Sequence, residues 1–67
     1  MKTVEQYLRE LRESKKDKPQ QVKEALQIYI DLWEKVIGKR VVDSEDDIET
    51  ALSKIDKQGG LYEAAGE

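Results

Sequence analysis

The most apolar part of this chain is the stretch from residue 22 to residue 37, in which ten of sixteen residues are apolar. At about 100° per residue, nine of these ten fall within an arc of roughly 160°, and Ile28 lies about 40° beyond one edge. This spacing predicts an amphipathic helix whose apolar face is wider than one neighbouring helix can cover. We therefore expect the segment to be the central helix of a small bundle, packed on two sides or against a second chain.

A shorter apolar stripe precedes this segment. Val4, Tyr7, Leu8 and Leu11 recur at the spacing of one helix face. Residues 3–6 match a capping box, in which a threonine and a glutamine satisfy each other's free backbone amides. The pattern predicts a first helix over residues 3–15, followed by a lysine-rich loop.

The central helix is predicted over residues 19–37. Pro19 suits its first turn, because the N–H that proline lacks has no partner there. Asp17 is the better candidate for the N-terminal cap. Gly38 is the expected C′ residue, since glycine readily takes the left-handed conformation that ends many helices.

The connector after Gly38 contains Val41 and Val42, which are too few to form a stable strand. We expect these two valines to plug the end of the bundle. A third helix then opens at Asp43 or Ser44 and is predicted over residues 44–58.

The apolar stripe of the third helix consists of Ile48, Ala51, Leu52 and Ile55. Gly59 and Gly60 end it, and with Gly60 at C′ the following Leu61 could contact Ile55. Residues 61–65 are predicted to add one further helical turn.

These elements predict an all-α fold, a three-helix up-down-up bundle with a short C-terminal helical turn. Short connections place consecutive helices antiparallel. Sixty-seven residues are enough for one small domain. The predicted core consists of Val4, Tyr7, Leu8, Leu11, Val22, Leu26, Tyr29, Trp33, Val36, Ile48, Leu52 and Ile55.

Composition narrows the function. The chain has no cysteine and no histidine, which excludes a disulfide framework and a cysteine–histidine zinc site. Its net charge of −3 comes from interspersed acids and bases, as is typical of a solvated surface. Charges interrupt every apolar run, so no membrane span is predicted, and no apolar signal-peptide core precedes the first helix. We therefore expect a cytoplasmic protein.

The acidic segment from Asp43 to Glu49 is the first candidate site. Read as a calcium loop, it has Ile48 where a glycine is needed and Lys54 where a bidentate glutamate is needed. Acids at a helix N-terminus are the simpler interpretation, because the helix dipole favours them there. No metal or cofactor is predicted.

Nucleic-acid binding is the alternative function, through Arg9, Arg12 and Lys16 on one face of the first helix. Glu5 and Glu13 lie on the same face and weaken the prediction. A helix-turn-helix interpretation also fails, because the first turns of the third helix are anionic and would repel phosphate.

No catalytic site is predicted, so we expect no enzyme activity. The chain lacks histidine, its carboxylates fall mostly on predicted solvent faces, and no motif surrounds any serine or threonine.

The apolar surplus of the central helix is the strongest functional indication. Either a second copy of the chain covers it in a two-fold homodimer, or residues 61–65 fold back over its edge. Tyrosine is also common among interface anchors. The interface hypothesis comprises Ile28, Tyr29, Ile30, Leu32, Ile37 and Tyr62. We therefore predict a small non-catalytic protein-interaction module or accessory subunit, with a protein partner or a second copy.

Overall fold

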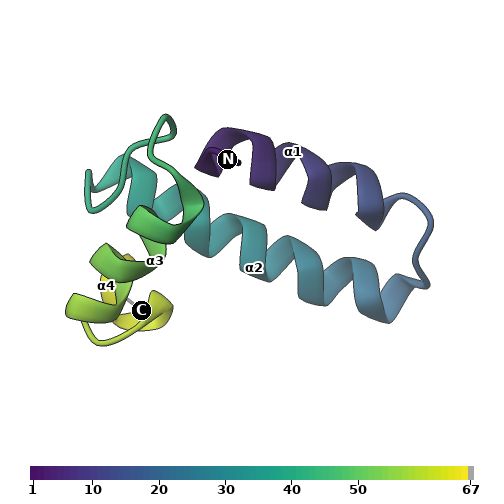
Figure 1. Cartoon of the computed structure of the whole chain (residues 1–67). Helices are drawn as coiled ribbons and strands as arrows, with labels where there is room; N and C mark the ends of the chain where they lie inside the picture. The colour runs from purple at the N-terminus through teal and green to yellow at the C-terminus, as the bar shows by residue number, and fades with distance from the viewer. Residues whose placement is uncertain (67) are drawn as a thin grey trace.

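The computed structural model describes residues 1–66, which form four helices and no strand. The helices are α1 (Val4–Lys15), α2 (Gln20–Gly38), α3 (Ile48–Lys57) and α4 (Leu61–Ala65). The long helices α1 and α2 form an antiparallel hairpin, and the short helices α3 and α4 lie together at the end of the hairpin that holds the N-terminus (Figure 1). The predicted all-α class is confirmed.

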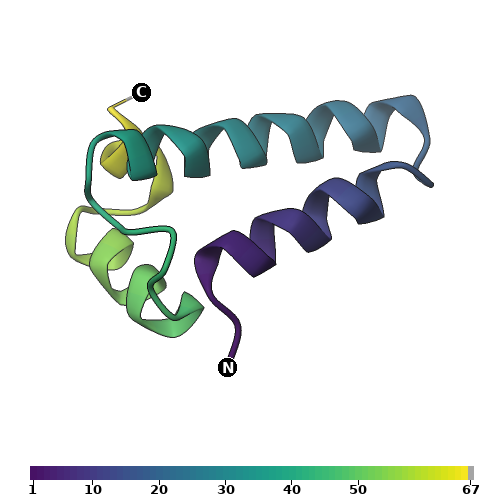
Figure 2. The ribbon, with the colours of Figure 1, turned by 90° about the horizontal axis from the view of Figure 1, so that it is seen from above.

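The two short helices have different partners. Helix α4 packs on α2, whereas α3 approaches α1 and α4 but, within residues 1–66, not the backbone of α2 (Figure 2). Ala64 and Ala65 of α4 are buried, and their small side chains allow this close packing. The C-terminal segment therefore folds back on the central helix, and the helix order is compatible with the predicted up-down-up course.

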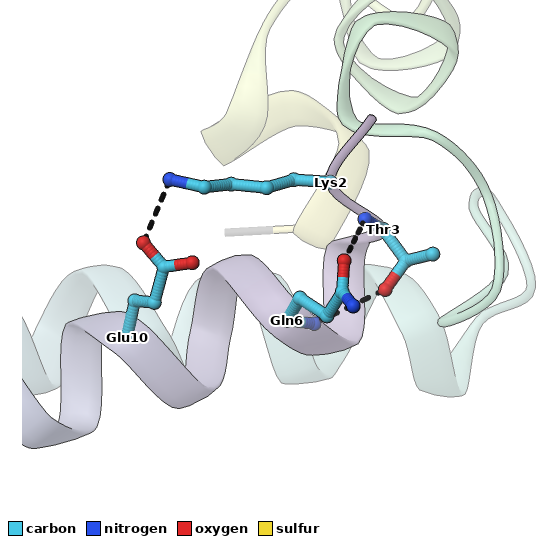
Figure 3. A network of polar contacts seen from close by, with 4 residues as sticks. All are labelled: Lys2, Thr3, Gln6 and Glu10. Atoms are coloured by element: carbon cyan, nitrogen blue, oxygen red, sulfur yellow. Dashed lines mark hydrogen bonds and ion pairs between the residues drawn. The ribbon is translucent and has the colours of Figure 1, made fainter.

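The predicted capping box at the start of α1 is present (Figure 3). Thr3 Oγ1 accepts a hydrogen bond from the Gln6 backbone N–H at 3.2 Å, and Gln6 Oε1 accepts from the Thr3 N–H at 3.0 Å. An ion pair of 2.7 Å between Lys2 Nζ and Glu10 Oε1 lies beside it. The two capping bonds fix where the first helix begins.

The acidic segment docks on the same helix start. The Val4 N–H donates to the Asp46 carbonyl at 2.9 Å, and the Glu5 N–H donates to the Ser44 carbonyl at 3.0 Å. These two amides belong to the first turn, where a helix offers them no internal partner. Because residues 43–47 supply the missing acceptors, α3 begins only at Ile48, four residues later than predicted.

The connectors after α2 and α3 leave their helices through the same hydrogen-bond pattern, a Schellman ending. After α2, the Arg40 N–H donates to the Ile37 carbonyl and the Val41 N–H to the Val36 carbonyl, both at 3.0 Å. Arg40 takes the left-handed position with a φ of 63°. The C′ residue is thus Arg40, and Gly38, predicted there, is the last residue of the helix.

The end of α3 and the start of α2 also differ from the predictions. The C′ residue of α3 is Gly59, with a φ of 93°, and Gly60 caps the start of α4. The Gly60 N–H donates to the Ile55 carbonyl at 3.1 Å, so the ending closes one residue earlier than predicted. Pro19 takes the N-cap position of α2, which has no side-chain cap, so the predicted Asp17 cap is not formed.

The core confirms most of the predicted residues. Val4, Leu8, Trp33, Val36 and Ile55 are buried, and the partly buried Tyr7, Leu11, Tyr29 and Ile48 pack against them. Leu26 is half-buried. The buried residues that the predicted core omits are Ile30, Leu32, Val42, Ala51, Ala64 and Ala65. Of these, Val42 was expected to pack into the end of the bundle, and it is buried.

Two predicted core residues are exposed. Val22 has 40% of its surface exposed, because the short helices lie at the opposite end of the hairpin and cannot cover it (Figure 1). Leu52 is 50% exposed, because within residues 1–66 the backbone of α3 does not approach that of α2 closely and this edge of the α3 stripe faces the space between them. None of the described helices combines the length and the apolar character needed to cross a membrane.

Candidate functional site

A groove separates α2 from α3 and the start of α4, with a volume of about 540 Å³. It exists because α3 leans on α1 and α4 and leaves a space along α2. The residues that line it are Tyr29, Trp33, Leu52, Ser53, Ile55, Asp56, Gly60 and Leu61. We call this surface the α2–α3 groove.

The α2–α3 groove is mainly apolar and open to solvent. Trp33 and Ile55 lie beneath its surface, Tyr29 and Leu61 are half-buried, and Leu52 is half-exposed at its edge. A half-exposed leucine beside other apolar side chains leaves apolar surface in water, and covering that surface is favourable by about 25 cal/mol per Å². A partner that covers the groove would therefore gain favourable free energy from burying this apolar surface.

An aromatic cluster supports the α2 side of the groove. The rings of Tyr7, Tyr29 and Trp33 make three edge-to-face contacts, with centroids 5.9–6.4 Å apart. The Tyr7 and Tyr29 hydroxyls share a hydrogen bond of 3.1 Å. Since each ring contacts the other two, Tyr29 and Trp33 have fixed positions in the groove wall.

Two polar groups of this cluster are unusual. Burial, together with the hydrogen bond and the charge of Tyr29, raises the pKa of Tyr7 to about 12. The Trp33 Nε1–H is buried and has no acceptor within residues 1–66. A buried donor without an acceptor destabilises a fold by about 1–3 kcal/mol, so the burial of the indole ring must outweigh this loss.

Among residues 1–66, Asp56 is the one charged residue that lines the α2–α3 groove. It lies in the last turn of α3, and its carboxylate has no hydrogen bond or ion pair with the described residues. The carbonyl end of a helix is the negative end of its dipole, so an acid there is unfavourable. The groove thus holds a carboxylate that its own helix repels.

A second, smaller hollow of about 280 Å³ lies along α2, lined by Ile28, Asp31, Leu32, Lys35 and Tyr62. Helix α4 borders both hollows, because Leu61 lines the α2–α3 groove with Tyr29 and Trp33, whereas Tyr62 lines this one with Ile28 and Leu32. Helix α4 therefore divides the apolar surplus of α2 into two open edges. The structure brings three of the six predicted interface residues, Ile28, Leu32 and Tyr62, into this hollow.

The predicted interface residues differ in exposure. Ile28 and Tyr62 are 56% and 62% exposed, whereas Leu32 and Ile30 are buried within the chain. Tyr29 belongs to the α2–α3 groove, and the half-buried Ile37 lines a third hollow of about 390 Å³ beside the connector. The six residues therefore do not form one continuous surface.

The larger groove includes residues that sequence reasoning missed: Leu52, Ser53, Asp56, Gly60 and Leu61. The helical spacing of Leu52 fits the α3 stripe and so predicts a core position instead of a groove edge. One feature of the sequence could have drawn attention to Asp56: it is an acid in the last turn of a helix, where the helix dipole disfavours negative charge.

The acidic segment has a structural role. Asp46 Oδ2 accepts hydrogen bonds from Lys54 Nζ at 2.7 Å and from the Asp43 N–H at 3.0 Å. The bond from Lys54, followed by that from the Asp43 backbone, lowers the pKa of Asp46 below its usual value. In the part of the chain that the structure describes, no three acidic side chains are grouped to hold a metal ion.

The basic face of α1 is paired with carboxylates. Arg9, Arg12 and Lys16 each lie within 3.4 Å of a glutamate oxygen, and the Arg12 pair, at 2.9 Å, joins α1 to Glu34 of α2. These surface pairs reduce the positive potential that phosphate binding requires. The face resembles an ordinary solvated helix surface.

Neither protein-family models, nor curated proteins, nor solved structures gave a match to this chain.

Proposed function

We propose that this protein is a non-catalytic interaction module that binds a partner protein in the α2–α3 groove. The observation that carries the proposal is the half-exposed Leu52, set beside Tyr29 and Leu61 at the edge of an apolar groove of about 540 Å³. Protein interfaces typically centre on aromatic and aliphatic side chains in such hollows, surrounded by polar groups. Ser53 and Asp56 provide polar groups in this lining.

The rigidity of the groove wall supports binding. The aromatic cluster fixes Tyr29 and Trp33, and the Schellman ending at Gly59 fixes the turn from α3 into α4. A preformed surface loses little conformational entropy when a partner docks, so more of the interaction energy contributes to affinity.

Selection from a random peptide display library tests this function, with the purified full chain as bait. We expect enriched peptides to bind the wild-type chain and to lose about tenfold or more in affinity for Leu52→Ser, since burial of the leucine is lost. Val22→Ser is the matched control, because Val22 is also an exposed aliphatic residue but lies outside the groove.

Trp33 provides the readout, because it is the only tryptophan and lies in the groove wall. Binding should change its fluorescence emission in the wild-type chain and in Val22→Ser. Failure to enrich any peptide, or equal affinity for the wild type and Leu52→Ser in variants with unchanged circular dichroism, would contradict the proposed function.

A further inference from the structure

The residues that line the α2–α3 groove indicate the chemistry of a partner, if the groove binds one as its proposed function requires. We propose that the docking segment of the partner presents an aliphatic or aromatic side chain next to a lysine or arginine. The apolar side chain packs on Tyr29, Leu52 and Leu61, and the basic group pairs with the carboxylate of Asp56.

Charge complementarity is the first argument. Asp56 is the one charged group in the groove lining, and nothing within residues 1–66 neutralises its side chain. Asp56 is exposed in the free chain, so a partner that also covers its carboxylate would either place a positive group beside it or bury it unpaired, which is unfavourable. The net charge of −3 also attracts basic segments over longer distances.

The position of Asp56 is the second argument. The last turn of α3 also contains Lys54 and Lys57, which suit the negative end of the helix dipole, whereas Asp56 opposes it. A residue that weakens its own helix and gains no contact in return is typical of a functional site. A basic group from a partner would supply the missing contact.

A second copy of the chain fits the groove poorly. A two-fold contact between two such grooves would bring two Asp56 carboxylates toward each other, and like charges across an interface are repulsive. If the groove instead bound a different surface of a second copy, the contact would repeat from copy to copy and form a ring or an open filament, not a closed dimer. We therefore assign the groove to a different protein.

Three synthetic peptides with one apolar sequence test the partner chemistry. They carry lysine, glutamine or glutamate one helical turn from a central leucine, and Trp33 fluorescence measures their affinity for the full chain. We expect the lysine peptide to bind about tenfold tighter than the glutamate peptide at low salt, with a smaller ratio at high salt.

Variants of the acid complete the experiment. Asp56→Asn should remove the preference for the lysine peptide, and Asp56→Lys should reverse it. Asp17→Lys is the matched control, because it changes the net charge as much as Asp56→Lys but lies in the loop at the far end of α2 (Figure 1). Both Asp56 variants should melt at higher temperature than the wild type, so lost binding cannot be attributed to unfolding.

The outcomes separate the two proposals. Binding that depends on Leu52 but ignores both peptide charge and Asp56 overturns the partner chemistry and leaves the proposed function intact. Binding of no peptide, or binding that Leu52→Ser does not weaken, contradicts the proposed function itself. Self-association of the wild-type chain in sedimentation, abolished by Leu52→Ser, would assign the groove to a second copy and overturn the partner chemistry.

Discussion

Trp33 links the core of this protein to its candidate site. Its ring contacts Tyr7 of α1 and Tyr29 of α2, and the same side chain lies in the wall of the α2–α3 groove. It is fully buried, although its indole N–H has no acceptor within residues 1–66. A substitution at this position should therefore affect stability and binding together.

Trp33→Ala should destabilise the fold by about 3–5 kcal/mol, because a buried tryptophan leaves a large cavity when truncated. A domain of this size has about 3–5 kcal/mol of stability in total, so the variant should be largely unfolded in water. Tyr62→Ala, which truncates an exposed aromatic residue, is the control and should change stability by less than about 0.5 kcal/mol. Cooperative urea unfolding of Trp33→Ala at the wild-type midpoint would show that the core assignment is wrong.

The hydroxyl of Tyr7 makes stability sensitive to alkaline pH. Burial and Tyr29 raise the pKa of Tyr7 to about 12, above its ordinary value of 10.0. The folded state thus holds the phenolic proton more tightly than the unfolded state. This contribution is fully present below pH 10 and is lost as the pH rises toward 12.

Melting temperatures measured across this alkaline range should fall more steeply for the wild type than for Tyr7→Phe. The variant keeps the ring contacts with Trp33 but has no proton to lose. The lysines titrate in the same range in both proteins, and the comparison cancels their effect. Parallel curves for the two proteins would rule out the raised pKa.

At the scale of elements, the helix endings show what local sequence could and could not reveal. The capping box at Thr3 was readable because both partners lie within four residues. The C′ position of α2 could not be predicted locally. Glycine prefers the left-handed conformation of that position, but the residue that adopts it is Arg40, two residues after Gly38. The start of α3 depends on carbonyls docking on α1, which no local pattern contains.

Arg40→Gly should stabilise the protein by about 0.5–1 kcal/mol, because glycine takes a φ of 63° without strain. Gly59→Ala is the opposite test and should destabilise it, since a Cβ at its φ of 93° would also lie 3.3 Å from Glu63 Cγ. Thermal unfolding measures both changes. A lower melting temperature for Arg40→Gly would contradict the assigned conformation.

At the scale of the whole molecule, periodicity along α2 predicted both the central helix and its apolar surplus. The apolar face of α2 is wide because it packs against α4 and also contributes to two open hollows, one of which contains Ile28. The α2–α3 groove could not be predicted, because it depends on the backbone of α3 lying closer to α1 and α4 than to α2. That placement exposes Leu52, which the helical spacing alone assigns to the core.

The fold-back of α4 leads to a prediction about oligomeric state. Helix α4 packs on α2, and the hollow that remains beside Ile28 is small, at about 280 Å³. Ile28→Ser should leave the mass in light scattering unchanged across a dilution series. A dimer in the wild type that this substitution dissociates would show that α2 pairs with a second copy.

The central claim is that a partner binds in the groove between α2 and α3. Heteronuclear NMR of the nitrogen-labelled chain, titrated with the lysine-bearing peptide, tests it most directly. We expect the largest shift changes at Leu52, Ser53, Asp56 and Leu61, together with the single indole N–H resonance of Trp33. Shift changes centred on Ile28 and Tyr62, or on the outer face of α1, with these groove resonances unmoved, would contradict the claim.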